Sequence, residues 1–451
     1  MNFFKIYSLF PVFIQNILCS IKGYKLERER YGGEYKELFE SLKKSDDWNE
    51  DEIIKYKEQQ ISQILKYAYE HTKFYRRFFD QYGVKPEDFK CLNDLSKFPI
   101  LTKELVRENW EDMISDEFKR KDLIAYHTSG STGKALDFFW TKHSIRYYWA
   151  VVWRGRDRFG VKKGDLHINF TGKIVVPISQ TKPPYWRYNR PLNQYMLNMQ
   201  HITKEKIKDI VEFINSKKAR FFVGYPSIIH SFAMLVEETG LTIKNPPLYI
   251  FSSAEKMYDF QREIIERVFK GVKIIEHYGF SENAASASKN TEGLYQVDYE
   301  LGHMELKKSI IHDGLSTGEI LATGFQNLGM PFIRYEIGDT ATFISSYIIS
   351  DIEGRNGDFV ITPEGAKVMR FGYIFKCTKD IKECQIAQKK EGEMIVRAVL
   401  RQGADISGLE NDIRAAVKEW ISPTIKVIFE YVDAIPRTKA GKFKAVVSEL
   451  P

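Results

Sequence analysis

Cysteine is scarce in this sequence, which contains four cysteines in 451 residues. They are Cys19, Cys91, Cys377 and Cys384, and none of them is spaced as a C-x-x-C pair. Four cysteines are too few to build a disulfide framework in a chain of this length, and their spacing does not support a zinc cluster. The sequence therefore predicts a reducing, cytoplasmic location.

A strong excess of charge of one sign is also absent. The chain has 67 Lys and Arg residues against 60 Asp and Glu residues, which gives a formal net charge of +7. No long block of basic residues, zinc finger or RNA-binding motif accompanies this small excess. We therefore expect no nucleic-acid partner, whereas bound phosphates or a membrane surface are compatible with the charge.

No uninterrupted apolar run is long enough to cross a bilayer, but residues 1–21 carry an apolar stripe. Pro11, Gln15 and Asn16 interrupt the stripe, and no cleavage site with small residues follows it. We expect a helix that packs its apolar face on the protein, and the alternative is a peripheral contact with the inner face of a membrane. The residues of this face are Phe3, Ile6, Tyr7, Phe10, Phe13, Ile14, Ile17, Leu18 and Ile21.

Hydrophobic residues are plentiful and make up 43% of the chain, which is enough for a large core. After residue 126, short apolar runs alternate with helical patterns. This alternation predicts an α/β domain with a mainly parallel sheet. Strands are expected at 166–170, 220–223, 248–251 and 273–276, and helices at 51–82, 204–216 and 257–269.

A second structural unit is expected after a turn-rich segment at residues 353–358. A strand pattern at 393–400, a helical pattern at 409–420 and another strand pattern at 424–431 predict a compact α+β unit. We therefore expect two domains. The first is a large N-terminal α/β domain at residues 1–353, whose residues 1–120 are helical, and the second is a small C-terminal domain at residues 354–451.

The first segment that suggests chemistry is a loop rich in glycine and hydroxyl residues at positions 126–134. Glycines let the backbone approach an anion closely, and amides and hydroxyls can donate to phosphate oxygens. The spacing of Gly130 and Gly133 excludes a Walker motif. Taken alone, such a loop is more often a solvated turn. Its candidate phosphate-binding residues are Thr128, Ser129, Gly130, Ser131, Thr132 and Gly133.

A second segment, residues 276–282, follows a strand pattern. A strand end that delivers an aromatic ring, a glycine and a carboxylate is where α/β sheets place ligand-binding groups. Tyr278 can stack on a base, Ser281 can donate to a phosphate and Glu282 can hold Mg²⁺. The alternative is an ordinary strand-to-helix turn in which Ser281 or Glu282 caps the helix.

Two further segments lie toward the C-terminus. Asp339 follows a glycine at the end of an apolar strand pattern, and its carboxylate can accept hydrogen bonds from two ribose hydroxyls at once. The alternative for Asp339 is a hairpin turn. Residues 436–442 are basic and contain a glycine, so Lys442 can be brought onto a phosphoryl group as a point charge. In isolation this last segment is typical of a solvated tail.

Together, and in this order, the four segments resemble the motifs of the adenylate-forming superfamily of acyl-CoA synthetases and adenylation domains. Residues 128–133 resemble its phosphate loop, and residues 278–282 (YGFSE) resemble its Y-G-x-T-E motif with serine in place of threonine. Residues 334–339 are similar to its ribose-binding Y-x-T-G-D motif, Gly354 and Arg355 to its hinge motif, and residues 436–442 to the motif of its adenylation lysine.

Details in three segments narrow the resemblance. Residues 10–15 (FPVFIQ), 224–227 (GYPS) and 330–335 (MPFIRY) are similar to the phenylacetate–CoA ligase branch, and within it to the CapK-type proteins of capsule polysaccharide gene clusters. The resemblance implies an AMP-forming ligase that uses ATP and Mg²⁺, with CoA as a candidate acceptor. It also implies that the small C-terminal domain is a mobile lid.

The resemblance further implies roles for individual residues. Glu282 is expected to bind Mg²⁺, and Lys442 is expected to contact the phosphoryl oxygens in the transition state. His127 and His277 are expected to be structural, because a carboxylic acid is already ionised at neutral pH and needs no base. Tyr225 and Phe280 are candidates for the acid pocket. The remaining residues expected to bind ATP or AMP are Ser253, Ala254, Glu255, His277, Tyr278, Gly279, Ser281, Asp339 and Arg355.

Three functions are compatible with these features. The first activates a carboxylic acid as its acyl-AMP and transfers the acyl group to the thiol of CoA. The second couples the activated acid to an amine of a polysaccharide precursor. The third is a catalytically silent binding protein of the same fold, against which the retention of Lys442, Glu282 and Asp339 argues. The expected partners are a small carboxylic acid and a thiol or amine acceptor, and a homodimer is compatible with the sequence.

Overall fold

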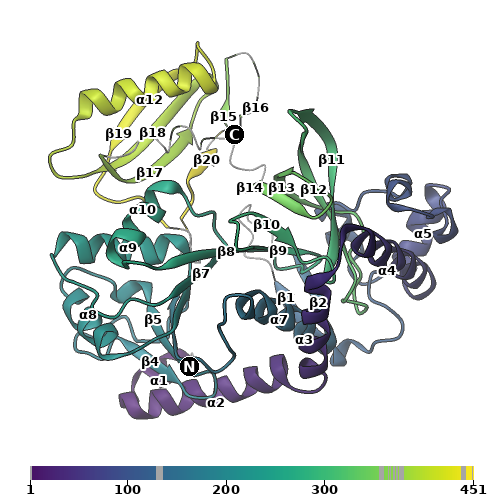
Figure 1. The fold of residues 1–451 in the computed structure, drawn as a ribbon, viewed down its shortest axis with the longest axis horizontal. Helices are drawn as coiled ribbons and strands as arrows, with labels where there is room; N and C mark the ends of the chain where they lie inside the picture. Colours follow the sequence, from purple (N-terminus) through teal and green to yellow (C-terminus); the bar gives the residue numbers. More distant parts are fainter. Residues whose placement is uncertain are drawn as a thin grey trace.

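The computed structural model of the chain has a mixed α/β fold, built around one large sheet and one smaller sheet (Figure 1). The fold class predicted from the sequence is therefore confirmed. The structure describes residues 3–127, 136–354, 360–363, 365, 367–368, 371, 374, 380–437, 443–448 and 450.

Among the described residues, the large sheet has 12 strands, of which one contiguous block is parallel. The block comprises β5, β3, β6, β7 and β8, and the other neighbouring pairs in the sheet are antiparallel. The spatial order is β11 (Gly302–His312), β12 (Leu315–Gly324), β13 (Tyr335–Phe343), β14 (Ile348–Glu353), β10 (Tyr295–Val297), β9 (Ser286–Lys289), β8 (Lys273–Gly279), β7 (Tyr249–Ser253), β6 (Phe221–Gly224), β3 (His167–Thr171), β5 (Gln194–Asn198) and β4 (Trp186–Asn189).

Helices cover both faces of the parallel block, which explains why its strands are apolar at successive positions. Phe222 and Ile250 pack in one core with the helices α8 (Ile207–Ser216), α9 (Pro226–Glu238) and α10 (Asp259–Val268). Phe221 and Phe251 point the other way and pack with α7 (Lys142–Asp157). The parallel strands β3, β6, β7 and β8 and the helices α8 and α10 lie within a few residues of their predicted positions, whereas β5 was not predicted.

The antiparallel half of the sheet was not predicted from the sequence. Its strands β11 and β12 mix polar and apolar residues, and a bulge between Lys307 and Ile310 breaks the simple alternation. A bulge shifts the side-chain register by one residue, so the period of two that marks a strand is lost there.

The N-terminal segment is helical, as predicted, but the expected helix at 51–82 is divided. Thr72 ends α4 (Glu50–His71), and its hydroxyl accepts a hydrogen bond from the backbone amide of Tyr75 at 3.1 Å to begin α5 (Lys73–Gln81). Extended backbone at Thr72 with a capping hydroxyl interrupts the helical period. The other described helices of this segment are α1 (Phe3–Ser8), α2 (Val12–Tyr31), α3 (Tyr35–Lys44) and α6 (Lys103–Asn109).

The expectation for residues 1–21 was wrong in two respects. Extended backbone at Pro11 separates α1 from α2, so the segment is two helices. Helix α2 packs its polar side against β4, so Gln15 and Gly23 are buried. Phe13, Ile17 and Ile21 of the predicted apolar face are exposed instead. Polar side chains on α2 find hydrogen-bond partners on β4, and this contact fixes the helix with its apolar face outward.

The C-terminal unit has its own four-stranded sheet and its own hydrophobic core. Its strands lie in the order β19 (Lys426–Tyr431), β18 (Glu393–Leu400), β17 (Ile381–Gln388) and β20 (Val446–Ser448), and α12 (Ile406–Trp420) packs against them. The unit contacts α9 and α10, where Arg401 pairs with Glu237 at 3.2 Å and Phe260 enters the C-terminal core. The domain boundary at Gly354 stays a prediction.

Candidate functional site

The candidate site lies where the parallel strands β6, β7 and β8 end. Gly224 of β6 pairs with Ser252 of β7, and Ser253 pairs with His277 of β8, so the three strands reach the same edge of the sheet together. Tyr225, Glu255 and Tyr278 follow at this edge. In open α/β sheets the carboxyl ends of parallel strands are where ligands bind.

Two hydrogen bonds cross between the segment 278–282 and strand β13. The hydroxyl of Tyr278 donates to Oδ2 of Asp339 at 2.6 Å, and the hydroxyl of Tyr335 donates to Oε1 of Glu282 at 2.6 Å. Each segment therefore gives a tyrosine hydroxyl to the carboxylate of the other. This exchange joins the two segments, far apart in the sequence, that carry the predicted ligand-binding carboxylates.

Glu282 is the described residue that best suits a divalent cation. It is 2% exposed, and its second carboxylate oxygen, Oε2, has no hydrogen-bond partner within the described part of the chain. A buried carboxylate oxygen without a partner is costly unless a ligand satisfies it. No group of three or more metal-ligating side chains exists among the described residues. A single carboxylate suits Mg²⁺, which takes its other ligands from phosphates and water.

Glu255 joins the large domain to the C-terminal end of the chain. Its Oε2 accepts a hydrogen bond from the backbone amide of Ser227 at 3.1 Å, at the start of α9, and its Oε1 accepts one from the amide of Phe443 at 2.9 Å. Ala254, directly before it, has a φ of 69°, a left-handed conformation that turns the chain at the strand end. Glu255 also raises the pKa of Tyr225, after burial as the larger cause.

His277 is held by neighbours within the protein. Its Nδ1 lies 2.9 Å from Oγ of Ser288, and its Nε2 lies 3.4 Å from the hydroxyl of Tyr148. Burial lowers its pKa below the ordinary value, so the ring is neutral at pH 7. These contacts favour the structural role expected for this histidine.

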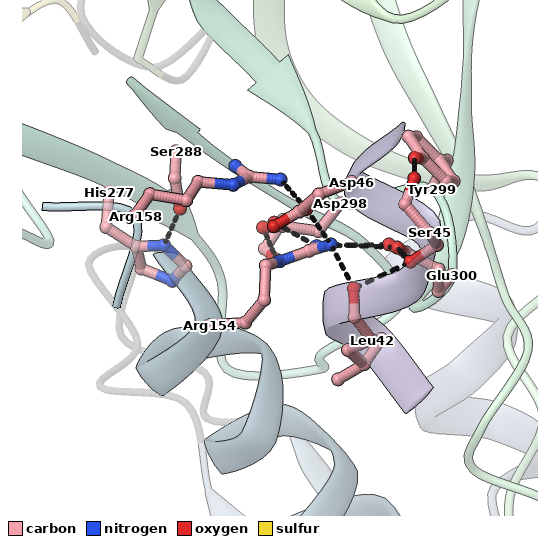
Figure 2. A network of polar contacts seen from close by, with 11 residues as sticks. Leu42, Ser45, Asp46, Arg154, Arg158, His277, Ser288, Asp298, Tyr299 and Glu300 are labelled. Carbon is pink, nitrogen blue, oxygen red and sulfur yellow. Dashed lines mark hydrogen bonds and ion pairs between the residues drawn. The ribbon is translucent and has the colours of Figure 1, made fainter. Parts of the chain in front are cut away.

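A buried network of polar contacts supports the strands behind the site (Figure 2). Arg154 of α7 is 1% exposed and lies within 2.8 Å of carboxylate oxygens of Asp46 and Glu300 and 3.2 Å from one of Asp298. Burial alone would lower the pKa of Arg154, but Glu300 and Asp298 outweigh it and raise that pKa. Asp298 in turn accepts a hydrogen bond from Ser286 of β9 at 2.6 Å. The network thus fixes β9, the neighbour of β8.

The other predicted residues fall into two groups. Ser253, Gly279 and Phe280 are half-buried at the strand ends, and Ser281 is exposed beside them. The residues that lie outside the described part of the chain are Thr128, Ser129, Gly130, Ser131, Thr132, Gly133, Arg355 and Lys442.

Tyr335 and the amide of Phe443 were not predicted as site groups. A signal for Tyr335 exists in the sequence, because Tyr335 and Asp339 have the same spacing as Tyr278 and Glu282. The register of β13 against β12 shifts between Glu336 and Thr340, so this spacing marks the two residues but does not place their side chains. The sequence gives no such signal for the amide of Phe443, since every residue except proline has a backbone amide.

Known proteins resemble this chain in sequence and in fold. Residues 360–449 match the family model of the CapK C-terminal domain. The protein CapK of Staphylococcus aureus is 28% identical over 99% of both chains. The phenylacetate–coenzyme A ligase of Escherichia coli is 36% identical over 69% of this chain and 73% of its own length. The crystal structure of 2-hydroxyisobutyryl-CoA ligase in the postadenylation state matches with a TM-score of 0.69 at 18% identity, over 88% of this chain and 90% of that one.

The fold and these similarities define an AMP-forming ligase, an enzyme that activates a carboxylic acid as its acyl-AMP. Within this class, the chain belongs to the phenylacetate–CoA ligase family of adenylate-forming enzymes and ends in a CapK-type C-terminal domain.

Proposed function

We propose that the protein uses ATP and Mg²⁺ to form an acyl-AMP and then passes the acyl group to the thiol of CoA. The observation that carries the proposal is the pair of crossed hydrogen bonds, Tyr278 to Asp339 and Tyr335 to Glu282, at the carboxyl edge of the parallel strands. The pair supports a site in which one carboxylate serves the ribose of ATP and the other serves its metal ion.

Asp339 is the proposed partner of the ribose. A carboxylate can accept hydrogen bonds from both ribose hydroxyls, and the bond from Tyr278 holds Oδ2 in a fixed orientation for this task. Arg355 is proposed to contact the ribose from the hinge. The ring of Tyr278, Ser253 and Ala254 would border adenine, with His277 and Gly279 beside them. Residues 128–133 and Ser281 would bind the phosphates.

Glu282 is the proposed Mg²⁺ ligand, through the oxygen Oε2 that has no partner among the described residues. The metal ion neutralises charge on the phosphates when it is bound. Tyr335 keeps the Glu282 carboxylate aimed by its bond to Oε1. Partners of this kind, which orient a metal ligand, strengthen metal binding.

The proposed reaction begins when a carboxylate oxygen of the acid attacks the α-phosphorus of ATP. The new O–P bond forms as the bond from that phosphorus to the bridging oxygen breaks, and pyrophosphate leaves with the electron pair. Negative charge on the phosphoryl oxygens is stabilised by Lys442, so the protein contributes position and electrostatics rather than a base. Tyr225 and Phe280 would line the pocket of the acid.

Glu255 is proposed to position Lys442. The amide that Glu255 binds belongs to Phe443, the residue that follows Lys442 in the chain. A hydrogen bond to a charged carboxylate is stronger than one between neutral groups, so it favours this placement of the segment. We also propose that the C-terminal domain begins at Gly354 and turns between the two half-reactions.

The acceptor separates the first candidate function from the second. The phenylacetate–coenzyme A ligases support a thiol, and the match to CapK along the full chain leaves an amine as the alternative. Incubation with ATP, Mg²⁺, a library of acids, CoA and amines, followed by mass spectrometry, decides between them. A thioester supports the proposal, whereas an amide formed without consumption of CoA supports the alternative.

Lys442→Ala tests the activation step itself. Loss of one electrostatic contact made in the transition state is expected to slow ATP–pyrophosphate exchange by roughly a hundredfold or more. Exchange at the wild-type rate would contradict the role of Lys442. If the wild-type protein binds ATP but releases neither AMP nor acyl-AMP with any acid, the silent binding protein is the correct alternative.

A further inference from the structure

Helix α2 attaches to the protein by its polar side. Oε1 of Gln15 accepts hydrogen bonds from Nε and Nη2 of the buried Arg187 at 2.8 and 2.6 Å, and Oδ1 of Asn16 accepts one from the amide of Tyr188 at 3.0 Å. At Gly23 the helix meets β4 so closely that a Cβ atom would lie 1.8 Å from Oδ1 of Asn189. These contacts fix the rotation of the helix about its axis.

This rotation turns large apolar side chains to solvent. Phe13, Ile17, Ile21 and Tyr24 are 64, 53, 60 and 56% exposed. Their spacing of four, four and three residues puts them in one stripe along the helix. Leu9, between α1 and α2 and 76% exposed, precedes the stripe in the chain. A contiguous exposed apolar stripe of this kind marks an interaction surface.

Helix α1 brings a second apolar segment near this surface. The hydroxyl of Tyr7 donates to the backbone oxygen of Val175 at 2.6 Å, so the loop around Val175 lies against α1. On that loop Ile174 and Ile178 are exposed, and Lys173 between β3 and Ile174 is exposed too. The loop that packs against α1 therefore also exposes apolar side chains.

The charges of this region are mainly positive, because α2 carries Lys22, Lys25, Arg28 and Arg30 against Glu29 and Glu27, and Glu27 pairs with Lys163. Lys22, Lys25 and Arg28 are exposed, and within the part of the chain that the structure describes none of the three forms an ion pair. Lys25 and Arg28 follow Ile21 and Tyr24 by four residues, which puts them one turn further along the same face. Residues 3–26 contain no Asp or Glu.

We infer that the outward face of α1 and α2 docks on a bilayer that contains anionic phospholipids, with α2 lying in the plane of the interface. Apolar side chains flanked by lysine and arginine are the composition of helices that bind membranes in this way. None of the described helices has the length and apolar character needed to cross a membrane. The surface therefore lies on the bilayer and does not span it.

Charge favours a bilayer over a second copy of this chain. In a symmetric dimer through this face, the net positive charge of α2 would face the same net positive charge of the partner helix. Like charges brought together oppose such a contact. Anionic lipid headgroups supply the opposite charge, which neither a neutral bilayer nor this face of a second copy does.

The position of α2 is compatible with catalysis at a membrane. In Figure 1, α2 runs along the bottom of the molecule, while the C-terminal sheet β17–β20 lies at the top. Docking through α2 therefore leaves the C-terminal unit in water, away from the bilayer.

Co-sedimentation of the full chain with large unilamellar vesicles tests the inference. One set of vesicles contains phosphatidylcholine alone, and the other contains phosphatidylcholine with phosphatidylglycerol. The test variant is Phe13→Ser/Ile17→Ser/Ile21→Ser. The control is Ile310→Ser/Ile311→Ser on β11. Ile310 and Ile311 are also large exposed apolar residues, each 73% exposed.

The wild-type chain is expected to partition onto the anionic vesicles at least tenfold more strongly than onto the neutral ones, and salt should weaken this binding. The test variant should lose at least tenfold in partitioning, since three apolar side chains are removed, while the control keeps the wild-type value. Lys22→Gln/Lys25→Gln/Arg28→Gln should lose the preference for anionic vesicles.

Three outcomes would overturn the inference. The wild-type chain stays in the supernatant with anionic vesicles, or the control loses as much binding as the test variant. In the third, analytical ultracentrifugation shows a dimer that the test variant dissociates, in which case a second copy covers this face. The first of these outcomes overturns the inference with the wild-type chain alone and does not depend on the folding of any variant.

Discussion

The hydroxyl of Tyr278 lies 2.6 Å from a carboxylate oxygen of Asp339, and it joins the end of strand β8 to strand β13 across the candidate site. Between these strands in the sheet order stand β9, β10 and β14, so the bond closes over three intervening strands. A contact of this kind depends on the curvature of the sheet. It links the nucleotide side of the site to the antiparallel half of the large domain.

Tyr278→Phe tests the importance of this bond for ATP. The substitution keeps the aromatic ring but removes the donor, and a hydrogen bond to a charged group contributes about 1.5 kcal/mol, or roughly tenfold in affinity. The KM for ATP in pyrophosphate exchange is expected to rise by about that factor. Tyr295→Phe is the matched control, because Tyr295 donates to Glu276 at 2.9 Å outside the proposed site. Equal KM values for the two variants would contradict the ribose role of Asp339.

Glu282→Gln tests the metal site. It removes the charge that the proposed Mg²⁺ needs, so the Mg²⁺ concentration for half-maximal activity is expected to rise by roughly tenfold or more. Tyr335→Phe keeps the charge of Glu282 and removes only the hydrogen bond that orients its carboxylate. The Mg²⁺ concentration for half-maximal activity is therefore expected to rise less in this variant. Glu276→Gln, a buried carboxylate paired with Arg262 and Lys289, is the control. If Glu282→Gln kept the wild-type Mg²⁺ titration, the metal ion would have to bind elsewhere.

Glu255→Ala tests the positioning of Lys442. The variant leaves the amides of Ser227 and Phe443 without their acceptor, so kcat for adenylation is expected to fall about tenfold with little change in the KM for ATP. In a Lys442→Ala background the same substitution should have almost no further effect, because both residues act through one contact. Additive losses would show that Glu255 acts independently of Lys442. Glu237→Ala, which removes an exposed ion pair with Arg401, is the control.

The buried His303 predicts acid sensitivity. Burial, with smaller contributions from Lys57 and Arg334, lowers the pKa of His303 to about 3. The unfolded chain binds a proton near pH 6.5 and the folded chain does not, so the free energy of unfolding falls as the pH drops from about 6.5 toward 3. At pH 5.5 the expected loss is ~1.4 kcal/mol from this residue.

Urea unfolding at several pH values measures this loss. The slope of the unfolding free energy against pH should become smaller in His303→Gln, by at most one bound proton. His312→Gln, at an exposed position of the same strand, should leave the slope unchanged. A wild-type slope in His303→Gln would show that other groups, such as His230 and His167, account for the acid sensitivity.

The parallel half of the large sheet could be predicted because its strands and helices have clean periods. Strand β6, for example, is apolar on both faces, and α8 and α10 carry a clear helical period. The antiparallel half lacks such a period, since β11 contains a bulge and many half-exposed polar residues. Its strands form because they pair with strands that are distant in the sequence, and a local sequence pattern does not reveal such pairing.

The candidate site shows the same division. Glu282, Tyr278 and Asp339 were predicted as site residues because they stand in short segments with recognisable spacing, but their hydrogen bonds to one another's segments could not be predicted. Glu255 binds the backbone amide of Phe443, a residue 188 positions further along the chain. A contact over such a distance in the sequence cannot be predicted from a local pattern. The face of α2 that packs was predicted wrongly, because hydrophobicity alone favours burying the apolar side. Partners on β4 for Gln15 and Asn16 decide otherwise.

The most direct test of the account follows an oxygen atom. The protein is incubated with ATP, Mg²⁺, CoA and carboxylic acids whose carboxyl oxygens are labelled with oxygen-18, and the AMP is analysed by mass spectrometry. If the carboxylate attacks the α-phosphorus, transfer of the acyl group leaves one labelled oxygen in AMP, and Lys442→Ala greatly slows the appearance of this label. Unlabelled AMP, or label found in inorganic phosphate, would contradict acyl-AMP formation at this site.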